Sequence, residues 1–207
     1  MRLDRLRDEV RHELSQTGAL SKVNDAAIDH ALAQSLVLLT PYYPSVRAVL
    51  TLTSTDAEQD LNLLATPRIG LLEEVWYPYF PDQPNQISPV RHALIGASTI
   101  QFFGIAPQVG EQLLAIYRAR YALAGLYTST ADTLPDDPAY EHPLLLAAVQ
   151  HLLMLEHTRL LFDKDKAIQS VAAALREFAA TLHNDAIDAA LSLGARPRNP
   201  AWSALGL

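Results

Sequence analysis

The sequence predicts an α+β protein: a helical bundle formed by N- and C-terminal helices, an inserted antiparallel β region and an extended C-terminal tail. Apolar residues recur at three- and four-residue spacing near both ends of the chain, which indicates amphipathic helices. The middle of the chain alternates apolar and polar residues and holds most of the thirteen prolines, which is typical of strands and loops. We therefore divide the chain into N-terminal helices (1–40), a β-rich insertion (41–135), C-terminal helices (136–194) and a docking tail (195–207).

The N-terminal region predicts two helices separated by a break at Thr17-Gly18. The first is mostly charged and carries a narrow apolar stripe, Leu3, Leu6, Val10 and Leu14. Asn24 is a candidate N-cap for the second, and Pro41 ends it. The residues expected to face inward from the second helix are Ile28, Leu32, Ser35, Leu36 and Leu39.

Strands are predicted where side chains alternate. Val46, Ala48, Leu50 and Leu52 alternate with Arg47, Val49, Thr51 and Thr53. The run LLEEVWY is expected to place Leu72, Glu74 and Trp76 opposite Glu73, Val75 and Tyr77, and TIQFF before Gly104 predicts a further strand. IYRARYAL, residues 116–123, alternates most strictly, and the proline-rich YPYFPDQPNQ predicts a long exposed loop.

The C-terminal region predicts two more helices. The first, from His142 onward, has two apolar stripes: Leu145, Ala148, Leu152, Leu155 and Phe162, and Leu146, Val149, Leu153 and Leu160. After a solvated break at DKDK (163–166), a second helix is expected to face inward with Ile168, Val171, Leu175, Phe178, Leu182, Ala186, Ala189 and Leu193, and to end at Gly194. The tail is too rich in proline for a helix, yet it carries Trp202, Leu205 and Leu207.

Composition excludes several classes of function. Without cysteine the chain has no disulfide, zinc-thiolate or iron–sulfur chemistry and no cysteine nucleophile. The formal net charge of −7 repels nucleic acid and anionic membranes from the molecule as a whole. The N-terminus lacks the apolar centre of a signal peptide, and the longest apolar run, 144–155, is shorter than the ~20 residues that a bilayer span requires. We expect a soluble protein with no membrane partner.

Motifs that carry catalysis are incomplete. His12-Glu13 begins a zincin-like pattern, but Gln16 stands where the second histidine belongs. His151, Glu156 and His157 lie at offsets that place them around the helix instead of on one metal. DKDK lacks both the glycine and the final acidic ligand of a calcium loop, and no P-loop or GxSxG elbow occurs. We therefore expect no enzymatic activity, no cofactor and no metal.

Arg118 and Arg120 share one face of the predicted strand 116–123, with Tyr117, Tyr121 and Leu123 on the other. Such arginines either hold a phosphate or substrate anion, or pair with carboxylates across the sheet. Cross-strand pairs of opposite charge are common and contribute about 0.2 to 1 kcal/mol. We favour pairing, with Glu73 or Glu74 as the partners.

The order of elements resembles the head-tail adaptor (connector) proteins of tailed bacteriophages. The resemblance covers about residues 1–195 and rests on V-x-Y-P (Val75, Tyr77, Pro78), the strand with Tyr117 and Tyr121, and LPDD (134–137) before a Leu/Ala-rich helix. It implies a non-enzymatic virion subunit, assembled in the host cytoplasm into a homo-oligomeric, dodecameric ring beneath the portal protein. The ring extends the channel for double-stranded DNA, without sequence-specific binding, and receives a downstream neck or tail protein.

The family resemblance also assigns surfaces. The C-terminal segment of such proteins reaches the portal, which points to a docking tail with Arg196, Arg198, Trp202, Leu205 and Leu207 as anchors. Subunit contacts are expected at Arg5, Asp8 and Arg11 of the first helix, for which a plain solvated helix is the alternative, and at Arg118, Arg120, Glu73 and Glu74. The channel surface is expected to be acidic or neutral, because ion pairs with phosphate would hold the DNA.

Two other functions stay open. The first is a small α+β enzyme or ligand-binding protein with a site between the β insertion and the helices, lined by Trp76, Tyr77, Tyr79 and Phe80. The second is a regulatory helical adaptor that binds another protein through the apolar stripe at 168–193.

Overall fold

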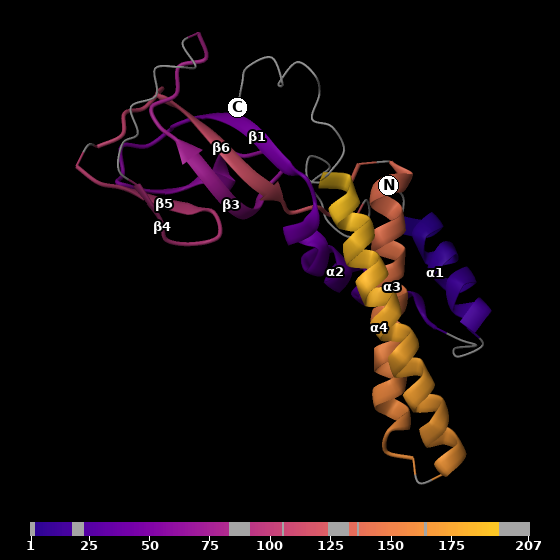
Figure 1. Ribbon diagram of the computed structural model, residues 1–207. Helices are drawn as coiled ribbons and strands as arrows, with labels where there is room; N and C mark the ends of the chain where they lie inside the picture. The colour runs from indigo at the N-terminus through magenta and orange to yellow at the C-terminus, as the bar shows by residue number, and fades with distance from the viewer. Residues whose placement is uncertain are drawn as a thin grey trace. The chain divides into compact units, whose positions relative to one another are not determined.

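The computed structural model describes residues 3–17, 23–82, 92–104, 106–123, 133–135, 137–163 and 165–194. In these ranges the protein is an α+β fold with helices at both ends and two small antiparallel sheets between them, as the sequence predicts (Figure 1). The helices are α1 (Leu3–Thr17), α2 (Asp25–Leu39), α3 (Pro138–Leu160) and α4 (Lys166–Gly194). The strands are β1 (Ser45–Thr51), β2 (Glu58–Asp60), β3 (Ile69–Trp76), β4 (His92–Leu94), β5 (Thr99–Phe102) and β6 (Gln112–Ala119).

The chain forms two compact units. One contains most of the helical residues, namely Asp4–Ser35, Tyr42–Pro44 and Pro135–Leu207. The other contains Met1–Leu3, Leu36–Pro41 and Ser45–Leu134, and with them all the described strands.

The two N-terminal helices of the helical unit form as predicted. Leu6, Val10 and Leu14 of α1 are buried, and so are the inward-facing residues predicted for α2. The Asn24 side chain caps α2 by accepting a hydrogen bond from the Ala27 backbone nitrogen at 2.8 Å. The Arg7 guanidinium donates to both carboxylate oxygens of Asp29, at 2.7 and 2.5 Å, and so joins α1 to α2.

Helix α3 begins earlier than the sequence predicts, at Pro138 instead of His142. The Asp137 side chain accepts a hydrogen bond from the Ala139 nitrogen at 2.8 Å and caps the helix. Pro138 is compatible with the first helical position because the backbone nitrogen there has no partner within the helix. The proline-rich segment before His142 therefore starts a helix.

Helices α3 and α4 form a long antiparallel hairpin (Figure 1). The predicted break at 163–166 lies at their connection, where Asp165 caps α4 by accepting from the Ala167 nitrogen at 2.8 Å. The stripe predicted for α4 is wrong at two positions, because Val171 and Phe178 are exposed while Ala172 and Ala179 are buried. The stripe predicted for α3 is likewise wrong at Leu155 and Phe162, which are exposed. Small residues at the contact let two helices approach closely, and the larger neighbours are then left outside it.

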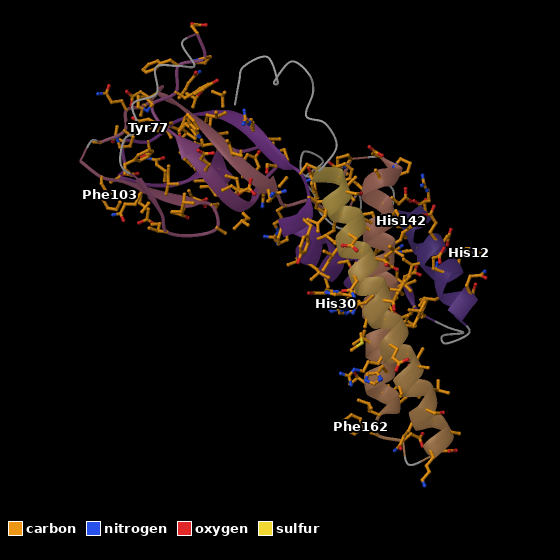
Figure 2. All side chains as sticks on the ribbon, in the orientation of Figure 1. His12, His30, Tyr77, Phe103, His142 and Phe162 are labelled. Carbon is orange, nitrogen blue, oxygen red and sulfur yellow. The ribbon has the colours of Figure 1, made fainter. Side chains whose placement is uncertain are left out.

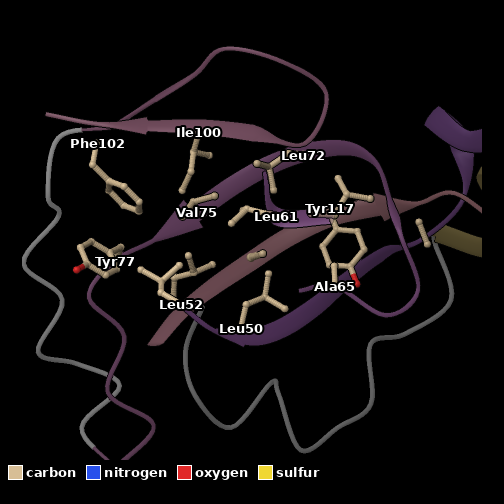
Figure 3. Packing of buried hydrophobic residues seen from close by; sticks show 14 residues of the cluster. Leu50, Leu52, Leu61, Ala65, Leu72, Val75, Tyr77, Ile100, Phe102 and Tyr117 are labelled. Atoms are coloured by element: carbon tan, nitrogen blue, oxygen red, sulfur yellow. The ribbon is translucent and has the colours of Figure 1, made fainter. Parts of the chain in front are cut away.

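The β unit contains two three-stranded sheets, of strand order β1-β6-β3 and β2-β5-β4. Their buried faces enclose one hydrophobic cluster (Figure 3), in which the ring centroids of Tyr77 and Phe102 are 4.6 Å apart. The alternation predicted for β1 is confirmed, since Leu50 is buried and Val49 exposed. The alternation predicted for residues 116–123 holds only as far as Ala119, where β6 ends; Ala122, expected on the face of the arginines, is buried. Along β6, the buried residues are Leu113, Ala115, Tyr117 and Ala119. The strand predicted from TIQFF is β5.

The alternation predicted for β3 is wrong. Leu72 and Val75 were expected on opposite faces, but both are buried, and Glu73 and Glu74 between them are both exposed. The register with β6 shifts between Leu72 and Glu74, which face consecutive residues, Tyr117 and Ile116. One extra residue in a bulged strand reverses the alternation beyond it, so Glu73 and Glu74 share the solvent side.

Gly70 of β3 lies where a side chain has no room. A Cβ atom at this position would lie 2.6 Å from the Thr40 Cγ2 methyl and 3.2 Å from the Arg118 carbonyl oxygen. A glycine inside a strand often marks such a close approach.

We predict that Gly70→Ala lowers the free energy of unfolding by about 1 to 3 kcal/mol, because the added methyl overpacks a site bounded by backbone. Thr40→Ser removes the clashing methyl and keeps the hydroxyl that donates to the Leu36 carbonyl oxygen at 2.9 Å. Chemical denaturation should therefore show partial recovery in the double variant. Equal stability of wild type and Gly70→Ala would contradict the packing described here.

Candidate interaction surfaces

The outer face of the β1-β6-β3 sheet carries the predicted pairing of Arg118. Arg118 Nε donates to Glu73 Oε1 at 2.6 Å, and the Ser45 hydroxyl donates to Glu73 Oε2 at 2.6 Å. Ser45 lies opposite Arg118 in the β1–β6 register, and the bulge in β3 brings Glu73 to the same place. The carboxylate therefore connects all three strands. The prediction that a β3 carboxylate pairs with Arg118 is confirmed for Glu73.

Arg120 and Glu74, which were also predicted to take part in charge pairing on this sheet, are not brought together. Arg120 lies beyond the end of β6 and is exposed, with its backbone nitrogen bonded to the Arg68 carbonyl oxygen at 2.8 Å. Glu74 is exposed opposite Ile116. Among the residues described, neither side chain forms an ion pair. Tyr117, Tyr121 and Leu123 were predicted to face inward. Tyr117 and Leu123 are buried, while Tyr121 is half-buried.

The same outer face carries an apolar row that the sequence analysis did not single out. Val49, Leu114 and Trp76 lie opposite one another across β1, β6 and β3. Val49 is exposed, and Leu114 and Trp76 are half-buried. An apolar row on a solvent face suits contact with another protein surface. The signal for it was the apolar Val49 among the predicted outward residues Arg47, Thr51 and Thr53.

The predicted interface residues of α1 are already paired within the chain. Arg5 contacts Glu9 at 2.9 Å and Glu141 of α3 at 2.5 Å, and Arg11 contacts Asp8 at 3.1 Å and also pairs with Asp25 of α2. Burial and the nearby Glu9 carboxylate raise the pKa of Glu141, whereas the hydrogen bond from Arg5 lowers the pKa of Glu9. These pairs hold α1 against its neighbours in the helical unit. Any subunit contact at Arg5, Asp8 or Arg11 would meet side chains that already have partners.

The α3–α4 hairpin exposes large apolar side chains where the two helices join. Phe162 is 84% exposed, and Figure 2 shows it at the connection between α3 and α4. Exposed apolar residues nearby are Leu155, Leu161 and Val171, and Phe178 is exposed further along α4. The sequence analysis assigned Leu155, Phe162, Val171 and Phe178 to the core, so it missed this surface.

His151, Glu156 and His157 of α3 are the polar residues that could have formed a metal site, but each contacts different groups. The buried His157 donates from Nδ1 to the Ala172 carbonyl oxygen at 2.7 Å, since a carbonyl can only accept. Glu156 binds Arg159 at 2.5 Å, and the His151 ring lies 5.8 Å from the His30 ring of α2, centroid to centroid. Nowhere in the described ranges do three histidine, aspartate or glutamate side chains form a metal-binding group.

The aromatic residues proposed to line a ligand site have different surroundings. Tyr77 is buried in the core of the β unit, and its hydroxyl donates to the Glu111 carboxylate. Burial, followed by the Glu111 contact, raises the pKa of Tyr77 to about 12. Trp76 and Tyr79 are half-buried, and Phe80 is exposed. Tyr77 therefore belongs to the core of the β unit.

The tail residues Arg196, Arg198, Trp202, Leu205 and Leu207 lie outside the described residues. Within the described part of the chain, none of the helices combines the length and apolar character of a membrane span. No protein-family model matches the sequence, and no curated protein shows significant similarity to it.

We predict that the Arg118–Glu73 pair contributes weakly to stability. A double-mutant cycle with Arg118→Ala and Glu73→Ala should give a coupling energy of about 0.2 to 1 kcal/mol, because the pair is partly solvated. Arg120→Ala is the matched control and should show no coupling with Glu73→Ala. A coupling energy above about 2 kcal/mol would mean that the pair is far more desolvated than described.

His151 makes stability depend on pH. Burial lowers the pKa of His151, and the nearby His30 lowers it further. The unfolded chain, whose histidine has an ordinary pKa near 6.5, therefore takes up a proton more readily than the folded chain. The contribution to stability is complete above about pH 6.5 and is lost as the pH falls through the folded-state pKa.

We therefore expect the free energy of unfolding to fall less steeply in His151→Asn than in wild type as the pH decreases from about 7 to 5. Denaturant titrations at a series of pH values would measure the two slopes. Gln150→Asn, a change without a titrating group at the adjacent position, should keep the wild-type slope. Parallel curves for wild type and His151→Asn would disprove the role of His151.

Proposed function

We propose that the protein is a structural virion subunit, a head-tail adaptor that forms a ring under the portal protein and extends the DNA channel to the neck or tail. The observation that carries the proposal is the order of elements: two N-terminal helices, a β region with V-x-Y-P, and a long helical hairpin preceded by LPDD. Localisation in the virion, after assembly in the host cytoplasm, is part of the proposal.

The distribution of apolar side chains supports a protein that works through its surfaces. The hairpin exposes Phe162, Val171 and Phe178, and the sheet exposes the row at Val49. Contiguous exposed apolar residues commonly mark sites where another protein binds. Two such regions on one chain suit a ring subunit, because each subunit of a heterologous ring needs two different contact surfaces.

In this proposal the charged residues of the sheet contribute to subunit contacts. Arg118 and Glu73 are held by their mutual contact, so they offer a fixed pattern of charge, while Arg120 and Glu74 are exposed nearby. Fixed charges at the edge of an interface affect orientation and the rate of association more than affinity. Arg5, Asp8 and Arg11 would contact the neighbouring subunit through the atoms that their ion pairs within the chain leave exposed.

The acidic balance suits a channel through which DNA moves. A formal net charge of −7 on each chain limits ion pairs with phosphate, which supply most non-specific affinity for DNA. We propose that the channel surface is acidic or neutral, that the subunit binds no cofactor and that it catalyses no reaction.

Assembly with the portal tests the proposal. Co-expression with a portal protein of the same virus should give a complex in which native mass spectrometry and electron microscopy find a twelve-membered ring of this chain beneath the portal. Trp202→Ala with Leu205→Ala should abolish copurification with the portal, because these are the proposed anchors. Leu191→Ala, an exposed leucine of α4, is the control and should keep the complex.

Two outcomes would reject the proposal. One is a strict monomer that never binds the portal at concentrations where other virion proteins assemble. The other is a turnover that depends on residues within a single copy.

A further inference from the structure

The outer face of the β1-β6-β3 sheet carries a second row of side chains beside the apolar row. In this second row Arg47 of β1, Ile116 of β6 and Glu74 of β3 lie opposite one another. Arg47 and Glu74 are exposed, and Ile116 between them is half-buried. Because β6 is the middle strand, the cation lies on one side of it and the carboxylate on the other. The face therefore combines an apolar centre with opposite charges on its two outer strands.

A two-fold axis that runs along β6, between two such faces, makes the face complementary to itself. The rotation places β1 of each copy over β3 of the other and leaves β6 over β6. Arg47 then faces the partner's Glu74, and Val49 faces the partner's Trp76. The apolar side chains of the middle strand face their own counterparts. Opposite charges and apolar groups are thus matched in one arrangement.

A two-fold axis across the strands lacks this match. It places β1 over β1 and β3 over β3, so Arg47 and the partner's Glu74 lie over different strands and do not meet. Like charges then lie on facing strands, which opposes association. The charge pattern therefore favours the axis along β6.

We propose that the free chain forms a two-fold dimer in which the outer faces of two β1-β6-β3 sheets pack together, with Arg47 of each copy at the partner's Glu74. The occupant of the face is a second copy because the pattern of charge matches itself under this rotation. Stacked sheets cross at about 30°, which shifts facing residues of the outer strands by less than about 3 Å. The long side chains of arginine and glutamate cover this shift. Arg118 also lies on the axis, but its contact with Glu73 of the same chain offsets its charge.

The size of the face predicts a weak and reversible dimer. The face extends about 20 Å along β1, from Ser45 to Thr51, and about 10 Å between the axes of β1 and β3. It is smaller than a standard interface, in which each partner buries about 800 Å². We therefore expect a Kd of about 1 µM or higher.

This inference goes beyond the proposed function, because a ring with a single rotation axis contains no two-fold contact between its subunits. The dimer is a state of the free chain, and it must separate before the sheet face meets a different surface in the ring. It covers the exposed apolar row until assembly begins, and its weakness permits the exchange.

Charge reversal tests the contact. Each dimer contains the contact between Arg47 and Glu74 twice, so either Arg47→Glu or Glu74→Arg turns two attractions into two repulsions. Sedimentation velocity over a concentration series should give each single variant a Kd at least about tenfold above that of wild type. The double variant restores both contacts with reversed sign, and its Kd should return to within about threefold of wild type. Arg176→Glu on α4 and Glu58→Arg on β2 are matched controls at exposed residues outside the face and should keep the wild-type Kd.

A mixture of the two single variants distinguishes contacts between copies from contacts within one chain. Arg47→Glu has acidic side chains at both positions, and Glu74→Arg has basic side chains at both, so neither variant matches itself. A dimer with one copy of each contains two pairs of opposite charge. The mixture should therefore form a heterodimer with a Kd near that of wild type, which a variant that failed to fold could not do.

Three results would overturn the proposal. The first is a chain that stays monomeric up to about 1 mM. The second is a dimer whose Kd is unchanged in Arg47→Glu, and loss of that dimer in Phe162→Ser would assign the contact to the hairpin. The third is a pair of single variants that stay monomeric when mixed. All measurements use the isolated chain, so a missing dimer leaves the ring proposal in place, and a missing ring leaves the dimer in place.

Discussion

The close packing of α3 against α4 determines which surfaces the helical unit presents. The α4 side of this contact alternates leucine with alanine, and Ala172, Ala179, Ala186 and Ala190 are all buried. Alanine lets the helix backbones approach closely. The hydrogen bond from His157 of α3 to the Ala172 carbonyl oxygen shows how near they come, because an imidazole reaches the backbone of the facing helix. Val171 and Phe178 lie beside this contact and are exposed.

This constraint explains where the reading of the hairpin from sequence succeeded and failed. A three- and four-residue repeat was evident, and Leu175, Leu182, Ala186 and Leu193 are buried as expected. Two repeats shifted by one residue fit the sequence, one through Val171 and Phe178 and the other through Ala172 and Ala179. Hydrophobicity favours the larger residues, whereas the space between two helices favours the smaller ones. Periodicity cannot decide between these effects without the distance between the helices.

The β unit shows a second limit of the same kind. Alternation predicted β1 and residues 116–119 of β6 correctly, because these residues pair in a regular register. In β3 one bulge reverses the alternation, and the sequence LLEEVWY gives no sign of it. The residue types nevertheless suggested the ion pair that the bulge produces. The bulge places Glu73 where it binds both Ser45 and Arg118. The charge pairing was predictable from cross-strand chemistry, but the backbone irregularity that produces it was not.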